Sequence, residues 1–159
     1  PMELQRGVEP GGATRFADFI TKDVLPTVER AASVSTRRVI AGHSLAGLFA
    51  VHTLASTGIF EGHIAISPTL GWGGEKTLDD LITSLKTRDA APRRLYASVA
   101  NDTPAYLKAF TRLEKALGGS TPGWLKHRTR RYTDEDHVTT VGPALQDAMK
   151  WMYQGDASR

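Results

Sequence analysis

Hydrophobic and polar positions along the chain follow two different spacings. Three short apolar runs, at residues 37–41, 62–67 and 95–100, are typical of buried strands. A basic run at residues 128–133 predicts a fourth, exposed strand near an edge of the sheet. Elsewhere apolar residues recur every three or four positions, as at Leu78, Leu81, Ile82 and Leu85, which predicts amphipathic helices. Alternating strands and helices favour a parallel sheet covered on both faces. We therefore expect an α/β fold, a three-layer α/β/α sandwich with a mainly parallel sheet.

The same helical spacing predicts four further helices, over residues 14–28, 45–57, 103–117 and 145–152. Pro26 should bend the first of these, because proline lacks the N–H that a helical hydrogen bond needs. Residues 1–13 contain two prolines and three glycines and are expected to form a flexible lead-in. One domain is then expected over residues 14–155.

The composition narrows the possible classes of protein. The 159 residues carry a net charge of +3, are 40% hydrophobic and include no cysteine, which favours one soluble domain and excludes disulfide scaffolds, thiolate metal sites and cysteine nucleophiles. No apolar run approaches the ~20 residues of a membrane span. The compartment stays open: cytoplasmic or, if an upstream signal has been removed, periplasmic or secreted. The basic cluster from Lys126 to Arg131 indicates a charged outer strand, so no nucleic-acid partner is expected.

The segment with recognisable chemistry is VIAGHSLAG, in which an apolar run passes through a glycine-flanked serine directly into a helix. This is the context of a nucleophile elbow, where small neighbours permit a tight, strained turn that exposes the serine. Ser44 is therefore the candidate nucleophile, and the N–H of Leu45 is placed to bind an oxyanion. Ala46 stands where a second glycine is usual. A helix N-cap is the alternative interpretation of Ser44.

A serine hydroxyl is a weak nucleophile and needs a histidine base, usually oriented by an acid. In hydrolases built this way the chain order is serine, acid, histidine. Asp102 directly follows the strand at 95–100, and His137 lies in the loop after the strand at 128–133. We predict Ser44, Asp102 and His137 as the triad. Asp102 could instead cap the next helix, and three neighbours could orient the imidazole in its place: Asp134, Glu135 and Asp136.

Two further residues are candidates for the oxyanion and substrate side of the site. His43 occupies the variable position of the turn, and Trp72 lies in a glycine-rich loop after the second strand, at the edge where open α/β sheets bind ligands. The plainer alternative for Trp72 is loop packing. The other histidines show no metal-ligand spacing and no glycine-rich phosphate loop follows a strand, so we expect neither a metal nor a cofactor.

Together these segments resemble the esterase family of the α/β-hydrolases that includes enterochelin (siderophore) esterases, esterase D-type S-formylglutathione hydrolases and mycolyltransferases. The resemblance rests, in order and spacing, on Phe16–Pro26, Arg38–Ala50, Ile64–Pro68, Asp136-His137, Ala144-Leu145 and Lys150–Met152. It implies an α/β-hydrolase fold with Ser44 as nucleophile and His137 as base. It also places the acid at or just after residues 95–100, where members often have Glu and this chain offers Asp102.

The resemblance also implies that only the C-terminal half of the fold is present. The family's N-terminal half, with the strands before the elbow and the loop that supplies a second oxyanion N–H, has no counterpart in this sequence. We expect a serine-dependent hydrolase of small-molecule carboxylic esters that works through an acyl-enzyme. Acyl transfer on the same fold and a catalytically incomplete binding module are the alternatives. The exposed strand edge could also pair with a second copy of the chain.

Overall fold

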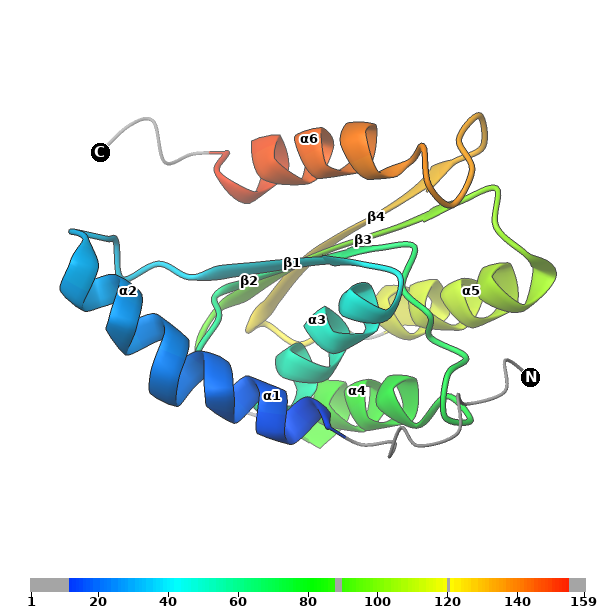
Figure 1. Ribbon diagram of the computed structural model, residues 1–159. Coiled ribbons are helices and arrows are strands. Elements are labelled where there is room, and N and C mark those ends of the chain that lie inside the picture. The colour runs from blue at the N-terminus through cyan, green and yellow to red at the C-terminus, as the bar shows by residue number, and fades with distance from the viewer. Residues whose placement is uncertain (1–11, 88–89, 120, 155–159) are drawn as a thin grey trace. The chain divides into compact units, whose positions relative to one another are not determined.

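The computed structural model describes residues 12–87, 90–119 and 121–154 (Figure 1). It divides the chain into two compact units, Pro1–Thr36 and Arg37–Arg159. Each unit is described by itself below.

The described part of the first unit is a helical segment with an irregular middle. It runs through α1 (Ala13–Phe19), a π-helical stretch η1 (Ile20–Val24) and α2 (Leu25–Ala31). Pro26 lies in the first turn of α2, and the missing proline N–H accounts for a departure from α-helical bonding just before it. The distortion expected at Pro26 is therefore present as a π-helical stretch. Of the expected lead-in, residues 1–11 lie outside the described residues, and Ala13 already belongs to α1.

The second unit is built on four parallel strands in the order β1-β2-β3-β4. The strands are β1 (Val39–His43), β2 (Gly62–Ile66), β3 (Arg93–Ala100) and β4 (Leu125–Tyr132). In the register, Ala41 lies beside Ile64, and Ile64 lies beside Tyr96. Because each strand pairs with the one before it, right-handed crossovers place all the connecting helices on one face of the sheet.

Helices cover both faces of this sheet, as Figure 1 shows. The connecting helices α3 (Leu45–Ser56), α4 (Lys76–Thr87) and α5 (Pro104–Gly119) lie on one face, and α6 (Val141–Met152) lies on the other. The larger core cluster joins α3, α4 and α5 to the sheet, whereas a smaller cluster packs Ala144, Ala148 and Met152 of α6 against Ile64 and Tyr96. The expected α/β/α sandwich is confirmed.

Three strands begin at other residues than predicted. β3 begins two residues earlier, at Arg93. β1 begins two residues later and includes Gly42 and His43, whereas β4 begins three residues earlier, at Leu125. Leu125 is buried and pairs with Arg93, but the polar residues that follow it interrupt the apolar pattern by which a strand is recognised. The residue at which a strand begins therefore depends on its pairing with the neighbouring strand.

The two edge strands are less buried than β2, whose five residues are all buried. Every described residue of β1 is at least partly exposed, and β4 alternates between exposed and more buried positions. The outer position predicted for β4 is confirmed. Its Arg130 forms an ion pair with Asp147, and Arg131 forms one with Glu114.

Within the described residues, the helices are all too short or too polar to cross a membrane.

Candidate active site

The turn between β1 and α3 holds Ser44 in an unusual backbone conformation. Its φ is 57° and its ψ is −118°, which costs on the order of 1–3 kcal/mol for a residue other than glycine. In the part of the chain that the structure describes, the Ser44 side chain makes no capping hydrogen bond to α3, although the residue occupies the N-cap position. The N-cap alternative therefore does not account for this serine. Strain at a residue whose hydroxyl does not cap its own helix makes Ser44 a candidate functional position.

Close packing at this turn explains two of its small residues. A Cβ atom on Gly42 would lie 2.1 Å from the backbone oxygen of Ala46, a separation that real Cβ atoms do not show. A Cβ on Gly47 would lie 3.1 Å from the backbone oxygens of Gly42 and Ile66. Ala46 itself is exposed, so its methyl group does not occupy the close approach between strand and helix. The tight contact that is expected of the second elbow glycine is made here by Gly47.

The carboxyl ends of the four strands lie at one edge of the sheet, because the strands are parallel. Ser44 follows β1 and Asp102 follows β3. The loop from Thr133 to Thr140, which carries His137, follows β4. The order of the chain thus brings the three predicted triad residues to the same edge.

Asp102 and His137 are in direct contact. The Nδ1 of His137 lies 2.6 Å from Oδ1 of Asp102, whose side chain is only 3% exposed. Since a carboxylate only accepts, Nδ1 carries the proton and Nε2 is left to receive one. The second oxygen of Asp102 accepts the N–H of Ala100 at 3.2 Å, so both oxygens are engaged away from α5. A buried carboxylate requires such partners.

The three alternative acids near His137 do not make this contact. Asp136 instead organises the loop: its Oδ1 accepts the N–H groups of Val138 and Thr139 at 2.8 Å each. The backbone hydrogen bonds that it makes with Thr139 and Val138 lower the pKa of Asp136. Asp134 is exposed, and Glu135 contributes its backbone oxygen to Asn101 at 2.9 Å. Asp102 is the acid whose geometry matches the predicted role.

Two aromatic rings lie against the imidazole of His137. The His43 ring centroid is 4.6 Å away, and His43 Nε2 lies 2.7 Å from the backbone oxygen of His137. Tyr106, in the first turn of α5, meets the His137 ring edge to face at 5.2 Å. His43 directly precedes Ser44, so the nucleophile turn and the loop of the base touch each other. The Nε2 of His43 is thus bonded to the protein backbone, and the oxyanion or substrate role of His43 stays a prediction.

Residues 4–147 match the family described as “Putative esterase”. The chain belongs to this family. Among curated relatives, it is 41% identical over 66 residues to ferri-bacillibactin esterase BesA of Bacillus subtilis, covering 40% of this chain and 23% of that protein. It is 26% identical over an alignment of 173 residues to the siderophore enterobactin esterase of Emericella nidulans, covering 89% and 56%.

The fold of this esterase-family chain is also found in solved structures. The IroE-like serine hydrolase from Shewanella oneidensis matches with a TM-score of 0.86 and 24% identity, covering 91% of this chain and 48% of that one. This likeness shows the α/β-hydrolase fold. The chain spans about half the length of this structure and of the Emericella relative, and 23% of the Bacillus relative.

The other two predicted binding residues have different surroundings. Leu45 is the first residue of α3, and the first N–H groups of a helix have no acceptor within the helix. The residue is 56% exposed. Its N–H remains the candidate oxyanion donor of this esterase-family chain. Trp72 is partly buried and packs against the larger core cluster. That packing accounts for Trp72 without a ligand.

Two residues of the site had not been singled out from the sequence. Ser67, at the end of β2, has a φ of 40°, is fully buried and accepts the same Ala100 N–H through its Oγ at 3.2 Å. Its position directly after an apolar strand was the available signal. Tyr106 could have been found as an aromatic residue one helical turn after Asp102. Ser67 supports the strand end that carries the acid, and Tyr106 packs against the base.

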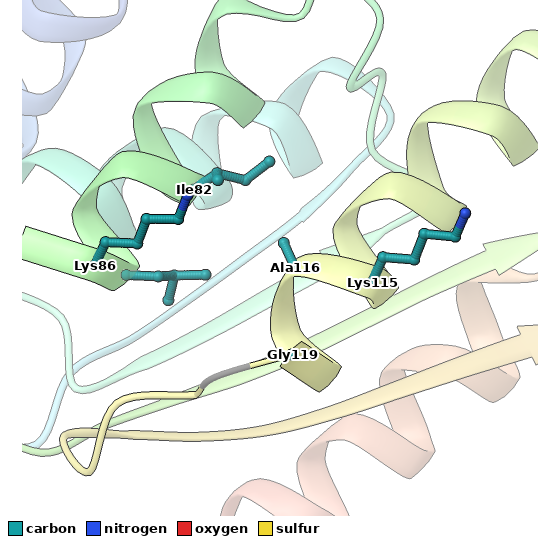
Figure 2. A pocket seen from close by; sticks show the side chains of 6 residues that line it. Ile82, Lys86, Lys115, Ala116 and Gly119 are labelled. Carbon is teal, nitrogen blue, oxygen red and sulfur yellow. The ribbon is translucent and has the colours of Figure 1, made fainter.

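A separate hollow of about 370 Å³ lies between α4 and α5 (Figure 2). Its lining residues are Ile82, Leu85, Lys86, Lys115, Ala116 and Gly119. They belong to the C-terminal halves of the two helices, which in a parallel α/β unit lie at the amino edge of the sheet. The hollow is therefore not part of the site around Ser44. Among the described residues, no group of three or more His, Cys, Asp or Glu side chains is arranged to hold a metal ion.

Proposed function

We propose that this chain carries the nucleophile, base and acid of a serine hydrolase that cleaves carboxylic esters. The observation that carries the proposal is the 2.6 Å hydrogen bond between the buried carboxylate of Asp102 and His137. The loop that carries His137 also contacts His43, directly before the strained Ser44. Membership of the esterase family supports the reaction class. The names of the Bacillus and Emericella relatives support siderophore esters as the substrate class.

The reaction has two stages, acylation of Ser44 and hydrolysis of the acyl-serine. Ser44 Oγ attacks the ester carbonyl carbon while its proton passes to His137 Nε2, and the N–H of Leu45 donates to the oxygen that becomes negative. The tetrahedral intermediate then collapses: the C–O bond to the alcohol breaks, and the alcohol leaves with the proton from His137. Water attacks the resulting acyl-serine by the same route, which releases the acid and restores Ser44.

The buried position of Asp102 matters because the imidazole becomes charged during each step. The carboxylate holds the proton of His137 on Nδ1 and stabilises the imidazolium that forms. The N–H of Leu45 is the oxyanion donor that the turn offers, and loss of one oxyanion donor lowers turnover by about 10²- to 10³-fold. Labelling by a reactive probe reports directly on whether Ser44 is activated.

The test is covalent labelling by a fluorophosphonate probe, followed by intact mass. We expect the chain to gain one adduct, Ser44→Ala to gain none, and His137→Ala to label at a rate lower by at least about 10³-fold. Ser56→Ala is the matched control, because Ser56 lies at the other end of α3 with its hydroxyl bonded to the backbone oxygen of His52. An adduct that persists in Ser44→Ala, or a folded chain that stays unlabelled, would refute the proposal.

A further inference from the structure

We propose that His43 is a positioning residue that ties the nucleophile turn to the loop of the base and fixes the orientation of His137. The proposal rests on the proposed function, because it assigns a role to a neighbour of the same site. It goes beyond that function by naming an interaction that neither the triad nor the oxyanion donor requires.

The bond between His43 and His137 has only one possible direction. The backbone oxygen of His137 can only accept, so the His43 Nε2 that lies 2.7 Å from it must carry a hydrogen. His43 is therefore held with its proton on Nε2, in the neutral or the charged form. His43 is the last residue of β1 and is partly buried, so the strand determines where its ring can lie.

Several contacts hold the loop that carries His137, and they act at different places. Asp136 accepts two backbone N–H groups within the loop, and the N–H of Asn101 donates to the backbone oxygen of Glu135. These bonds fix the loop to itself and to the end of β3. The bond from His43 acts on His137 itself and joins it to the element that carries Ser44. It is therefore the contact that sets the relative position of base and nucleophile.

The ring of His43 adds a second constraint. The His137 imidazole contacts two rings: the His43 ring, at 4.6 Å and tilted by 49°, and the Tyr106 ring, at 5.2 Å and nearly perpendicular. Its Nδ1 is bonded to Asp102 at the same time. The His137 side chain is 33% exposed, and each of these three neighbours restrains rotation of its ring. His43 and Asp102 together leave Nε2 as the free edge of the base.

The variants His43→Leu and His43→Gln distinguish the hydrogen bond to His137 from the packing of the His43 side chain. Leucine removes the donor, whereas the glutamine side-chain amide can place an N–H close to the position of the imidazole Nε2. Small errors in the placement of a reacting group cost up to 10²-fold in rate. We expect His43→Leu to lower the maximal rate of fluorophosphonate labelling by about 10-fold with the probe concentration at half-maximal rate unchanged. His43→Gln should restore most of that rate.

The control is His52→Leu, because His52 lies in the second half of α3, eight positions after Ser44, and its ring stacks with that of Phe49. It should label within about 2-fold of the unchanged chain, as expected for a residue outside the reacting groups. Equal labelling rates for His43→Leu and the unchanged chain would overturn the positioning role while leaving the proposed function standing. A loss that His43→Gln does not reduce would overturn the hydrogen bond as its cause.

A nuclear magnetic resonance measurement keeps the proposal testable if His43→Leu does not fold or if the chain does not label. Nitrogen-proton correlation spectra of the histidine rings in the unchanged chain report which ring nitrogen carries the proton. We expect His43 to carry it on Nε2, protected from exchange with water. A His43 ring with its proton on Nδ1 alone would refute the bond to His137, whatever the labelling experiment shows. Absence of labelling with the expected ring state would count against the hydrolase proposal only.

Discussion

In the second unit, polar groups at the amino ends of the strands differ in role from those at the carboxyl ends. These two sides of the sheet are its amino edge and its carboxyl edge. At the amino edge, arginines donate hydrogen bonds to the last backbone carbonyls of helices. Arg93 donates to Thr57 at the end of α3. Arg94 donates to Trp151 and Met152 at the end of α6. Arg37 adds a bond to Met152 at 2.6 Å. Cations are favourable at helix C-termini, where the last carbonyls lack partners. These contacts hold both helical layers onto the sheet.

At the carboxyl edge, polar groups are held in costly positions. Ser44 and Ser67 have positive φ values, and the carboxylate of Asp102 is buried against the imidazole of His137. A positive φ at a residue other than glycine and a buried carboxylate each lower the stability of the folded chain. The difference teaches that one edge of this sheet holds the layers together, whereas the other holds the candidate catalytic groups. Substitutions at the two edges should therefore separate activity from stability.

Apart from loss of the nucleophile itself, the largest effect on activity is expected from Asp102→Asn. The amide can no longer hold the proton of His137 on Nδ1, so labelling of Ser44 should fall by about 10³- to 10⁴-fold. Asp134→Asn, in the exposed part of the loop, is the control and should leave the rate unchanged within about 2-fold. A labelling rate for Asp102→Asn close to that of the unchanged chain would assign the acid elsewhere.

Gly42→Ala should have the largest effect on stability. The new Cβ would lie 2.1 Å from the backbone oxygen of Ala46, so β1 or α3 must shift, and we expect a loss of about 3 kcal/mol or more in the free energy of unfolding. Gly71→Ala is the matched control, because its Cβ would meet nothing within 4 Å. Chemical denaturation of both variants measures the difference. Equal midpoints would show that the turn is not as tightly packed as described.

Arg94→Met tests the amino edge. The variant loses two hydrogen bonds to the C-terminal carbonyls of α6, and we expect unfolding to become easier by about 1–3 kcal/mol. Labelling of Ser44 in the folded fraction should not change. Arg112→Met, which removes exposed ion pairs with Glu75 and Asp79, should move the denaturation midpoint less. A fall in the intrinsic labelling rate of Arg94→Met would mean that the two edges are coupled.

The smallest effect is expected from Asp136→Asn, and it depends on pH. The folded chain lowers the pKa of Asp136 through the backbone N–H groups of Thr139 and Val138, so the ionised carboxylate favours the folded state. This contribution is present above the unfolded pKa of about 3.9 and is lost as the pH falls through the lower folded value. Denaturation midpoints of the two chains should differ at pH 7 and converge below about pH 4. A difference that is constant over this range would contradict the assignment.

Much of the fold could be predicted because strands and helices follow local patterns. The run ahead of Ser44 and the helical spacing after it were enough to place the elbow, and the order serine, acid, histidine was enough to select candidates. The starts of β1 and β3 were each missed by two residues and the start of β4 by three. Strand bounds depend on the neighbouring strand, which the local pattern of apolar residues does not contain.

The site shows the same division between local and distant information. The amino-acid sequence by itself determined the α/β class, the turn of Ser44 and the edge of the sheet at which Asp102 and His137 meet, because each follows from spacing along the chain. Only the tertiary structure decided that Asp102, among four nearby acids, contacts His137 and that Asp136 shapes its loop. It alone joined His43 to His137, 94 positions apart in the chain. Such contacts depend on where separate strands end in space, and no local pattern of residues encodes that distance.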